Sequence, residues 1–341
     1  MAIIVKGEAK RIGLALSGGG FRAAAFHLGV FRKLKSIGIL WDLDLLTCVS
    51  GGSIAGAYLA ANWGNDAALD GLERYLKEKS IAVSSFLGGA IDPINSRLDK
   101  LASSYDAHLF HSMTLKDLSK GPRIYINATN LSSGNLFFFV AGGGKPAEMG
   151  EHELGVVQAD GFPLCKAVAA SSAFPPVFPP LRLEEPDYST PGIEYQTLTD
   201  GGIYDNLGVN PLLRMERNNL AYALVSDAGK PFDLNERPTE YGSAVLLESI
   251  SILMEQVRGL QFNRLQLSEK AQRGPKPLWF SIDSKIGEIR SGDSAFASAI
   301  GTNLKKLSGE EMDVLSRHAG ALLQHRISTY APELLPSEGK S

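Results

Sequence analysis

Residues 43–56 read Leu-Asp-Leu-Leu-Thr-Cys-Val-Ser-Gly-Gly-Ser-Ile-Ala-Gly, an apolar run that enters a glycine turn. A small-residue helical pattern follows and continues to about Asn62. The same order occurs upstream, where the apolar run 12–16 enters a glycine turn at 17–20 and a helical pattern extends over 21–37. Two successive units of strand, glycine turn and helix predict a parallel α/β sheet.

The downstream turn contains a candidate nucleophile. A serine on a sharp strand-to-helix turn exposes its Oγ at the top of a sheet, and the positions two before and two after it must be small. For Ser53 these positions are Gly51 and Ala55, so the match to Gly-x-Ser-x-Gly is approximate. The helix N-terminus beneath Ser53 also favours developing negative charge. A structural glycine turn that contains a serine is the competing interpretation.

The upstream turn, Gly18-Gly19-Gly20 followed by Phe21 and Arg22, can direct several backbone N–H groups at one anion. A P-loop needs a lysine that is missing here, and a dinucleotide fingerprint would need glycine at Ala23. The best functional interpretation is an oxyanion hole for a tetrahedral intermediate. The structural alternative is a tight turn between strand and helix.

An activated serine needs a base. Two carboxylates lie just beyond apolar runs: Asp200, in Thr199-Asp200-Gly201-Gly202, and Asp227. Asp-Gly by itself is a common turn signal. Spacing in the sequence does not choose between the two aspartates.

Taken together and in this order, the segments resemble the patatin-like phospholipase family. The family pattern is a Gly-Gly-Gly-x-Arg loop, a Gly-x-Ser-x-Gly elbow, a proline-rich segment and a late Asp-Gly-Gly/Ala. The matching stretches of this chain are Gly18-Gly19-Gly20-Phe21-Arg22, Gly51-Gly52-Ser53-Ile54-Ala55, residues 170–180 and Asp200-Gly201-Gly202. The departures are Ala55 in place of glycine and Ser17 where many members have aspartate.

The resemblance implies a Ser–Asp dyad in which Ser53 attacks and Asp200 accepts its proton. It assigns the oxyanion hole to the N–H groups of Gly18, Gly19 and Gly20. Supporting positions are expected to shape or hold the turns; they are Arg22, Gly51, Ala55 and Gly201. The expected reaction is hydrolysis of a phospholipid or other acyl ester through an acyl-serine, with no metal or organic cofactor.

The resemblance also implies a fold of three layers, in which helices flank a mainly parallel central sheet. Residues 1–227 would form the catalytic core and residues 228–341 a mostly helical C-terminal extension packed on it, within one structural domain. Residues 123–129 and 136–140 read as a hairpin, and 278–282 as a further strand. Ser308 to Glu311 has capping-box spacing and predicts the start of a helix.

Composition limits the function classes. Of 341 residues, 44% are hydrophobic and 21% charged, and the net charge of -3 excludes a broad positive field for nucleic acid. The 2 cysteines cannot form a disulfide scaffold. No run approaches the roughly 18 apolar residues of a membrane span. We therefore expect a cytoplasmic protein with peripheral, transient membrane contact, for which the apolar loop 84–91 is the candidate.

Two other function classes remain open. An α/β-hydrolase-type esterase or thioesterase would use a triad in the chain order Ser53, Asp227, His318. A catalytically silent lipid-binding regulator would keep the fold without the chemistry. His27, close to the glycine loop, shares a helical face with Phe31 and is expected to be a core histidine.

Overall fold

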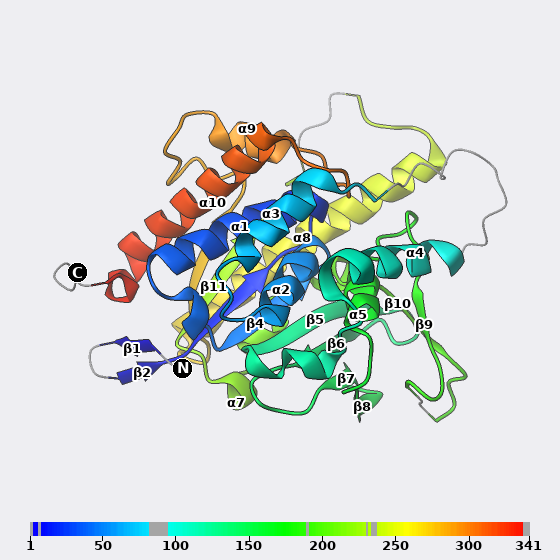
Figure 1. Cartoon of the computed structure of the whole chain (residues 1–341). Helices are drawn as coiled ribbons and strands as arrows, with labels where there is room; N and C mark the ends of the chain where they lie inside the picture. The colour runs from blue at the N-terminus through cyan, green and yellow to red at the C-terminus, as the bar shows by residue number, and fades with distance from the viewer. Residues whose placement is uncertain are drawn as a thin grey trace.

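Figure 1 shows the computed structural model of the chain, in which helices cover a central sheet. The described residues are 3–5, 8–81, 95–188, 191–229, 231–232 and 237–336. The loop 84–91, expected to contact lipid, lies outside them. The expected α/β fold is confirmed.

One half of the ten-stranded sheet is parallel. Its strands, in spatial order, are β12 (Lys276–Ser281), β11 (Tyr222–Asp227), β3 (Ile12–Leu16), β4 (Leu45–Val49) and β5 (Arg123–Asn130). Every residue of β3, β4 and β11 is buried, as expected for parallel strands covered on both faces. β12 comes from the segment 228–341 and pairs with β11, so this segment adds a strand to the sheet. A boundary at residue 227 stays a prediction.

The other half is antiparallel, so the sheet is parallel only from β12 to β5. Its strands are β6 (Leu136–Ala141), β7 (Glu148–Glu151), β8 (Gly155–Gln158), β9 (Leu181–Leu183) and β10 (Gln196–Asp200). β5 and β6 form the expected hairpin. β10 pairs with β5, beyond the end of β4. A separate two-stranded hairpin joins β1 (Ile3–Val5) to β2 (Glu8–Lys10).

Helices cover both faces of the sheet. The α-helices of the described residues are α1 (Gly20–Ser36), α2 (Gly51–Ala61), α3 (Ala68–Glu78), α4 (Asn95–Tyr105), α5 (Leu164–Ser171), α6 (Gly202–Asp205), α7 (Met215–Asn218), α8 (Gly242–Lys270), α9 (Asp293–Ala299) and α10 (Gly309–Tyr330). Side chains alternate along β3, so Leu14 and Leu16 pack in the core cluster of α1 and α10. Ala15 packs in the cluster that includes Leu265 of α8. This alternation separates two helical layers by the sheet.

Two sequence signals position the C-terminal helices. The expected capping box is present, because Glu311 N–H donates to Ser308 Oγ at 3.2 Å and Ser308 N–H donates to Glu311 at 2.7 Å. α10 then packs along α1, where a Cβ at Gly29 would lie 2.5 Å from the carbonyl oxygen of Ser316. In the described part of the chain, no helix combines the length and the apolar character needed to cross a bilayer.

Candidate active site

The turn between β4 and α2 places Ser50 in an unusual backbone conformation. Its φ is 51° and its ψ is -118°. Residues other than glycine rarely adopt a positive φ, and such strain concentrates at functional sites. Ser50 is the last residue before α2 and is partly exposed. This is the geometry in which a strand-to-helix turn presents a serine hydroxyl.

The two residues after Ser50 must be glycine because the backbone of the upstream turn lies against them. A Cβ at Gly51 would lie 2.1 Å from the carbonyl oxygen of Gly20. A Cβ at Gly52 would lie 2.3 Å from the carbonyl oxygen of Leu16. The serine turn and the glycine loop therefore touch, backbone against backbone.

Ser53, the serine that the sequence favours, lies in the first turn of α2 and is 0% exposed. Its Oγ is 2.7 Å from Ser171 Oγ. Ser171 donates in turn to the carbonyl oxygen of Asn127 at 2.6 Å, so Ser53 is the donor in the first bond. The Ser50 N–H also donates to Ser171, at 3.0 Å. Ser53 thus belongs to a buried polar network that holds the turn, and its geometry does not support the expected position of the nucleophile. Ser171 has no signal in the sequence that predicts this contact.

Asp200 is the last residue of β10, and β10 pairs with the same edge of β5 as β4 does. It is 2% exposed, and its Oδ1 accepts from the Gly202 N–H at 2.7 Å. Its Oδ2 has no hydrogen-bond partner among the described residues. Burial raises the Asp200 pKa to about 7, against the smaller lowering effects of the Gly202 N–H and the Ser50 hydroxyl. The Ser50 hydroxyl is therefore near the carboxyl, although no full hydrogen bond joins them.

The start of the proline-rich segment 170–180 lies against Asp200. The carbonyl oxygen of Ala173 accepts from the Asp200 N–H at 3.1 Å and from Thr199 Oγ1 at 2.9 Å. Tyr105 of α4 is fully buried, and burial raises its pKa, with smaller contributions from Tyr75 and from the Asp200 charge. These groups keep water from Asp200, which is why burial dominates the shift of its pKa.

The three N–H groups of the glycine loop differ in whether they have hydrogen-bond partners. The Gly18 N–H already donates to the carbonyl oxygen of Asn206 at 3.0 Å. The N–H groups of Gly19 and Gly20 have no partner among the described residues. Their φ values of 139° and 62° lie where glycine is favoured. Asn206 is a contact that no sequence signal predicts.

Arg22 stabilises the glycine loop through hydrogen bonds to two later segments of the chain. It is 0% exposed and donates to the carbonyl oxygens of Ala228 and Ile300, both at 2.9 Å. Burial lowers its pKa to about 10, with a smaller opposing effect of Asp227. The start of α1 is thereby tied to two later loops. Of the other supporting positions, Ala55 is buried inside α2, and a Cβ at Gly201 would lie 2.3 Å from the carbonyl oxygen of Asn127.

The residues of the alternative triad are engaged elsewhere. Asp227 is 0% exposed and pairs with Arg258 at 2.7 Å. His318 Nε2 donates to the carbonyl oxygen of Ile282 at 2.8 Å. His27 is a buried core residue as expected, with ring contacts to Ser226 and Ser17, and burial lowers its pKa to about 4. Among the described residues, no group of three or more His, Cys, Asp or Glu side chains could hold a metal.

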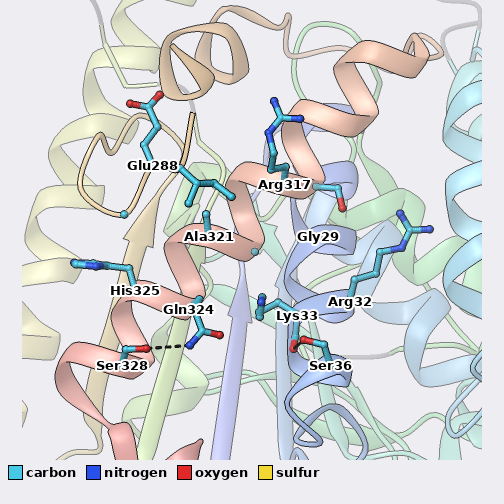
Figure 2. Close-up of a pocket in the computed structure, with 14 residues that line it drawn as sticks. Gly29, Arg32, Lys33, Ser36, Glu288, Arg317, Ala321, Gln324, His325 and Ser328 are labelled. Carbon is cyan, nitrogen blue, oxygen red and sulfur yellow. Dashed lines mark hydrogen bonds between the residues drawn. The ribbon is translucent and has the colours of Figure 1, made fainter. Parts of the chain in front are cut away.

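A groove of about 680 Å³ lies elsewhere, between α1 and α10 (Figure 2). Its lining includes Gly29 and Lys33 of α1 and Gln324 of α10. Gly29 is roughly 13 Å along the helix from Gly20, at about 1.5 Å per residue. The groove is therefore separate from the glycine loop and the serine turn.

Comparison with solved structures finds a similar fold. Human GIVD cytosolic phospholipase A2 superposes with a TM-score of 0.61 at 12% identity, over 95% of this chain and 62% of that one. Its complex with methyl gamma-linolenyl fluorophosphonate and terbium chloride gives 0.58 at 12% identity, over 95% and 59%. This chain thus spans about three fifths of the human protein, and the likeness shows the fold. No curated protein matches the sequence.

A family model described as Patatin-like phospholipase matches residues 14–213, more than half of the chain. The match includes both glycine turns and extends past Asp200. The chain belongs to the patatin-like phospholipase family.

Proposed function

We propose that the protein is a lipid acyl hydrolase in which Ser50 is the nucleophile and Asp200 its base. The observation that carries the proposal is the backbone of Ser50, which holds a partly exposed serine at a strained turn beside a buried carboxyl. Ser53 lacks these features, because its hydroxyl is covered and bonded to Ser171. The proposal keeps Asp200 and the glycine loop of the sequence analysis and moves the nucleophile by three residues.

The chemistry needs no group beyond the chain and water. The Ser50 hydroxyl gives its proton to Asp200 Oδ2, the oxygen without a partner, as Oγ bonds to the acyl carbon. The free N–H groups of Gly19 and Gly20 donate hydrogen bonds to the oxyanion. The carbon–oxygen bond to the alcohol breaks, and the alcohol takes the proton from Asp200. A water molecule then gives a proton to Asp200 as its oxygen bonds to the acyl carbon. The bond from that carbon to Ser50 Oγ breaks, and Ser50 takes the proton back from Asp200.

The raised pKa supports a dyad without histidine. An aspartate of ordinary pKa is a poor acceptor of a serine proton, and catalysis improves as the pKa of the base approaches the working pH. Burial gives Asp200 a pKa of about 7. Against the triad, Asp227 is already paired with Arg258 and His318 with Ile282.

The substrate class is proposed from the family and from the fold. The family model is named for phospholipases, and the human structural neighbour is a cytosolic phospholipase A2. We propose phospholipid or another acyl-ester lipid as substrate, cytoplasmic location and peripheral membrane contact. A silent lipid-binding regulator of the same fold remains the second candidate, and it predicts an unreactive Ser50.

A fluorophosphonate probe tests both the activity class and the nucleophile. The human neighbour has been crystallised with a reagent of this type. We expect the probe to label the wild type on the tryptic peptide that contains Ser50, and mass spectrometry of the fragments distinguishes Ser50 from Ser53. Labelling should vanish in Ser50→Ala and persist in Ser53→Ala. Labelling of Ser53 would overturn the assignment, and no labelling at all would favour the silent regulator. Total lipid extract incubated with wild type and Ser50→Ala would then identify the acyl ester that is cleaved.

A further inference from the structure

Four leucines form an exposed line along the 29-residue helix α8. They are separated by seven residues each, and their exposed fractions lie between 60% and 67%. They are Leu246, Leu253, Leu260 and Leu267. We call these four residues the leucine stripe. A monomeric protein seldom exposes so continuous an apolar surface without a partner for it.

The positions between these leucines complete a heptad pattern. Ile250 and Val257 lie four residues after Leu246 and Leu253, and both are partly exposed. Leucine at one core position of a heptad and β-branched residues at the other are typical of two-stranded coiled coils. The corresponding position four residues after Leu260 is Arg264. Its side chain donates to Asn210 at 2.7 Å and is therefore directed into its own chain.

The rest of α8 shows that the stripe is not a face of the folded core. Gln261 and Leu265 are buried, and Arg258 pairs with Asp227, so the C-terminal half is anchored to the sheet layer. Over 242–253, none of the side chains that the structure describes is buried. Among the described residues, the leucines of the N-terminal half, Leu246 and Leu253, therefore stay largely exposed at 61% and 60%.

A shallow groove lies at the C-terminal end of the leucine stripe. Its volume is about 360 Å³, and its lining on α8 includes Leu260, Asn263, Arg264, Leu267 and Ser268. The first four of these residues have the spacing i, i+3, i+4 and i+7. In a coiled coil, each core side chain inserts between four residues of the facing helix. The groove therefore points to a helix as the missing partner.

We propose that α8 of one chain packs its leucine stripe against α8 of a second copy, so that the protein is a coiled-coil dimer. A strict seven-residue repeat drifts by about 20° per heptad on a straight helix, and winding around a second helix removes that drift. Binding to a lipid surface would not require leucines at a strict seven-residue spacing. A second copy supplies the same stripe, and two-fold symmetry makes such a surface self-complementary. The proposal does not depend on the proposed activity.

The dimer also reaches the catalytic face. Met254 follows Leu253, and its Cε would lie 3.2 Å from a Cβ at Gly202. Gly202 donates to Asp200, so Met254, the residue after the second leucine of the stripe, is one residue away from the proposed base. The α8 helix of the partner would lie beside the part of α8 that packs on α6.

Sedimentation of the full chain over a wide range of concentration tests the proposal. We expect the wild type to sediment at twice the chain mass. Leu253→Glu would bury an unpaired charge in the coiled coil and should weaken association by about 100-fold or more. Leu253→Met should leave the dimer intact, because it conserves apolar volume. Ile252→Glu is the matched control: Ile252 is the preceding residue, is 41% exposed and lies off the stripe, so this variant should still dimerise.

Three results would overturn the proposal. The first is a wild type that stays monomeric at every concentration. The second is a dimer that survives the double change Leu253→Glu and Leu260→Glu. The third is equal loss of the dimer in Ile252→Glu. Flotation with phosphatidylcholine vesicles runs in parallel: a monomer that binds vesicles through Leu253 and Leu260 would make the stripe a lipid-binding face instead. Fluorophosphonate labelling of each variant separates failure of the dimer from failure of the proposed function.

Discussion

Val49 and Asp200 pair with two consecutive residues of β5. Val49, at the end of β4, is opposite Asn127, and Asp200, at the end of β10, is opposite Ala128. Consecutive Cα atoms are about 3.8 Å apart, so the two strands meet end to end along one edge of β5. Ser50 follows Val49 directly. This register is what brings the Ser50 hydroxyl near the Asp200 carboxyl.

The first prediction separates the two serines. Ser50→Ala should reduce ester hydrolysis by about 10³-fold or more, because only binding and oxyanion stabilisation would remain. Ser53→Ala should keep activity within a few-fold and cost about 1 kcal/mol of stability, since one buried hydrogen bond to Ser171 is lost. Initial rates on a soluble ester, with urea unfolding of both variants, measure these effects. The reverse pattern would return the nucleophile to Ser53.

The second prediction concerns Asp200 and catalysis. The carboxyl must be ionised to accept a proton, and its pKa is raised to about 7. The rate of acylation should therefore rise with pH up to about 7 and then level off. Asp200→Asn should lose this dependence and about 10²-fold or more of the rate. Stopped-flow acylation across the pH range measures both, and a flat profile in the wild type would exclude Asp200 as the base.

The third prediction concerns Asp200 and stability. Its folded-state pKa of about 7 exceeds the ordinary 3.8, so the folded protein binds more protons between these values than the unfolded chain. Stability is then lost as the pH rises from about 4 to about 7. Asp200→Asn removes this loss and should be more stable than wild type at about pH 8, by up to a few kcal/mol. Urea unfolding at about pH 4 should show a much smaller difference.

The fourth prediction concerns the contact between the two turns. Gly51→Ala places a Cβ 2.1 Å from the carbonyl oxygen of Gly20, so the turn must shift or the protein must unfold in part. We expect a lower melting temperature and loss of fluorophosphonate labelling. Gly161→Ala is the control, because a Cβ at Gly161 meets nothing within 4 Å. Normal labelling of Gly51→Ala would show that the two turns are not coupled.

The fifth prediction concerns the buried ion pair. Arg258→Gln leaves the Asp227 carboxylate without its charged partner at 0% exposure, which typically costs about 3–5 kcal/mol. The molecules that remain folded should still be labelled at Ser50, because Asp227 takes no part in the proposed chemistry. Chemical denaturation gives the loss of stability. Complete loss of labelling in folded protein would reopen the case for Asp227 as a catalytic group.

Sequence patterns were sufficient for the elements around the site, because those patterns are local. Apolar runs of five or more residues that end in glycine predict buried strands followed by tight turns, and β3 and β4 confirm this. The spacing of Ser308 and Glu311 predicts a capping box for the same reason. The motifs and their order also identify the family without tertiary information.

The choice of serine illustrates where local patterns are ambiguous. Ser53 has Gly51 before it and Ala55 after it, whereas Ser50 has Cys48 before it and Gly52 after it. Each serine departs from the pattern Gly-x-Ser-x-Gly at one position, so the pattern allows either serine as the nucleophile. The backbone favours Ser50, because the positive φ of the turn falls at Ser50 and the close carbonyl groups of Gly20 and Leu16 leave no room for side chains at Gly51 and Gly52.

Local sequence patterns predict the α/β class, the two glycine turns, the family and Asp200 as a candidate base. Which groups meet in space depends on the fold. It paired Asp227 with Arg258 and His318 with Ile282, gave the Gly18 N–H to Asn206, and buried Asp200 beside Ser50. The physical reason is that strand register, burial and the raised pKa depend on contacts between residues far apart in the chain, which no local pattern encodes.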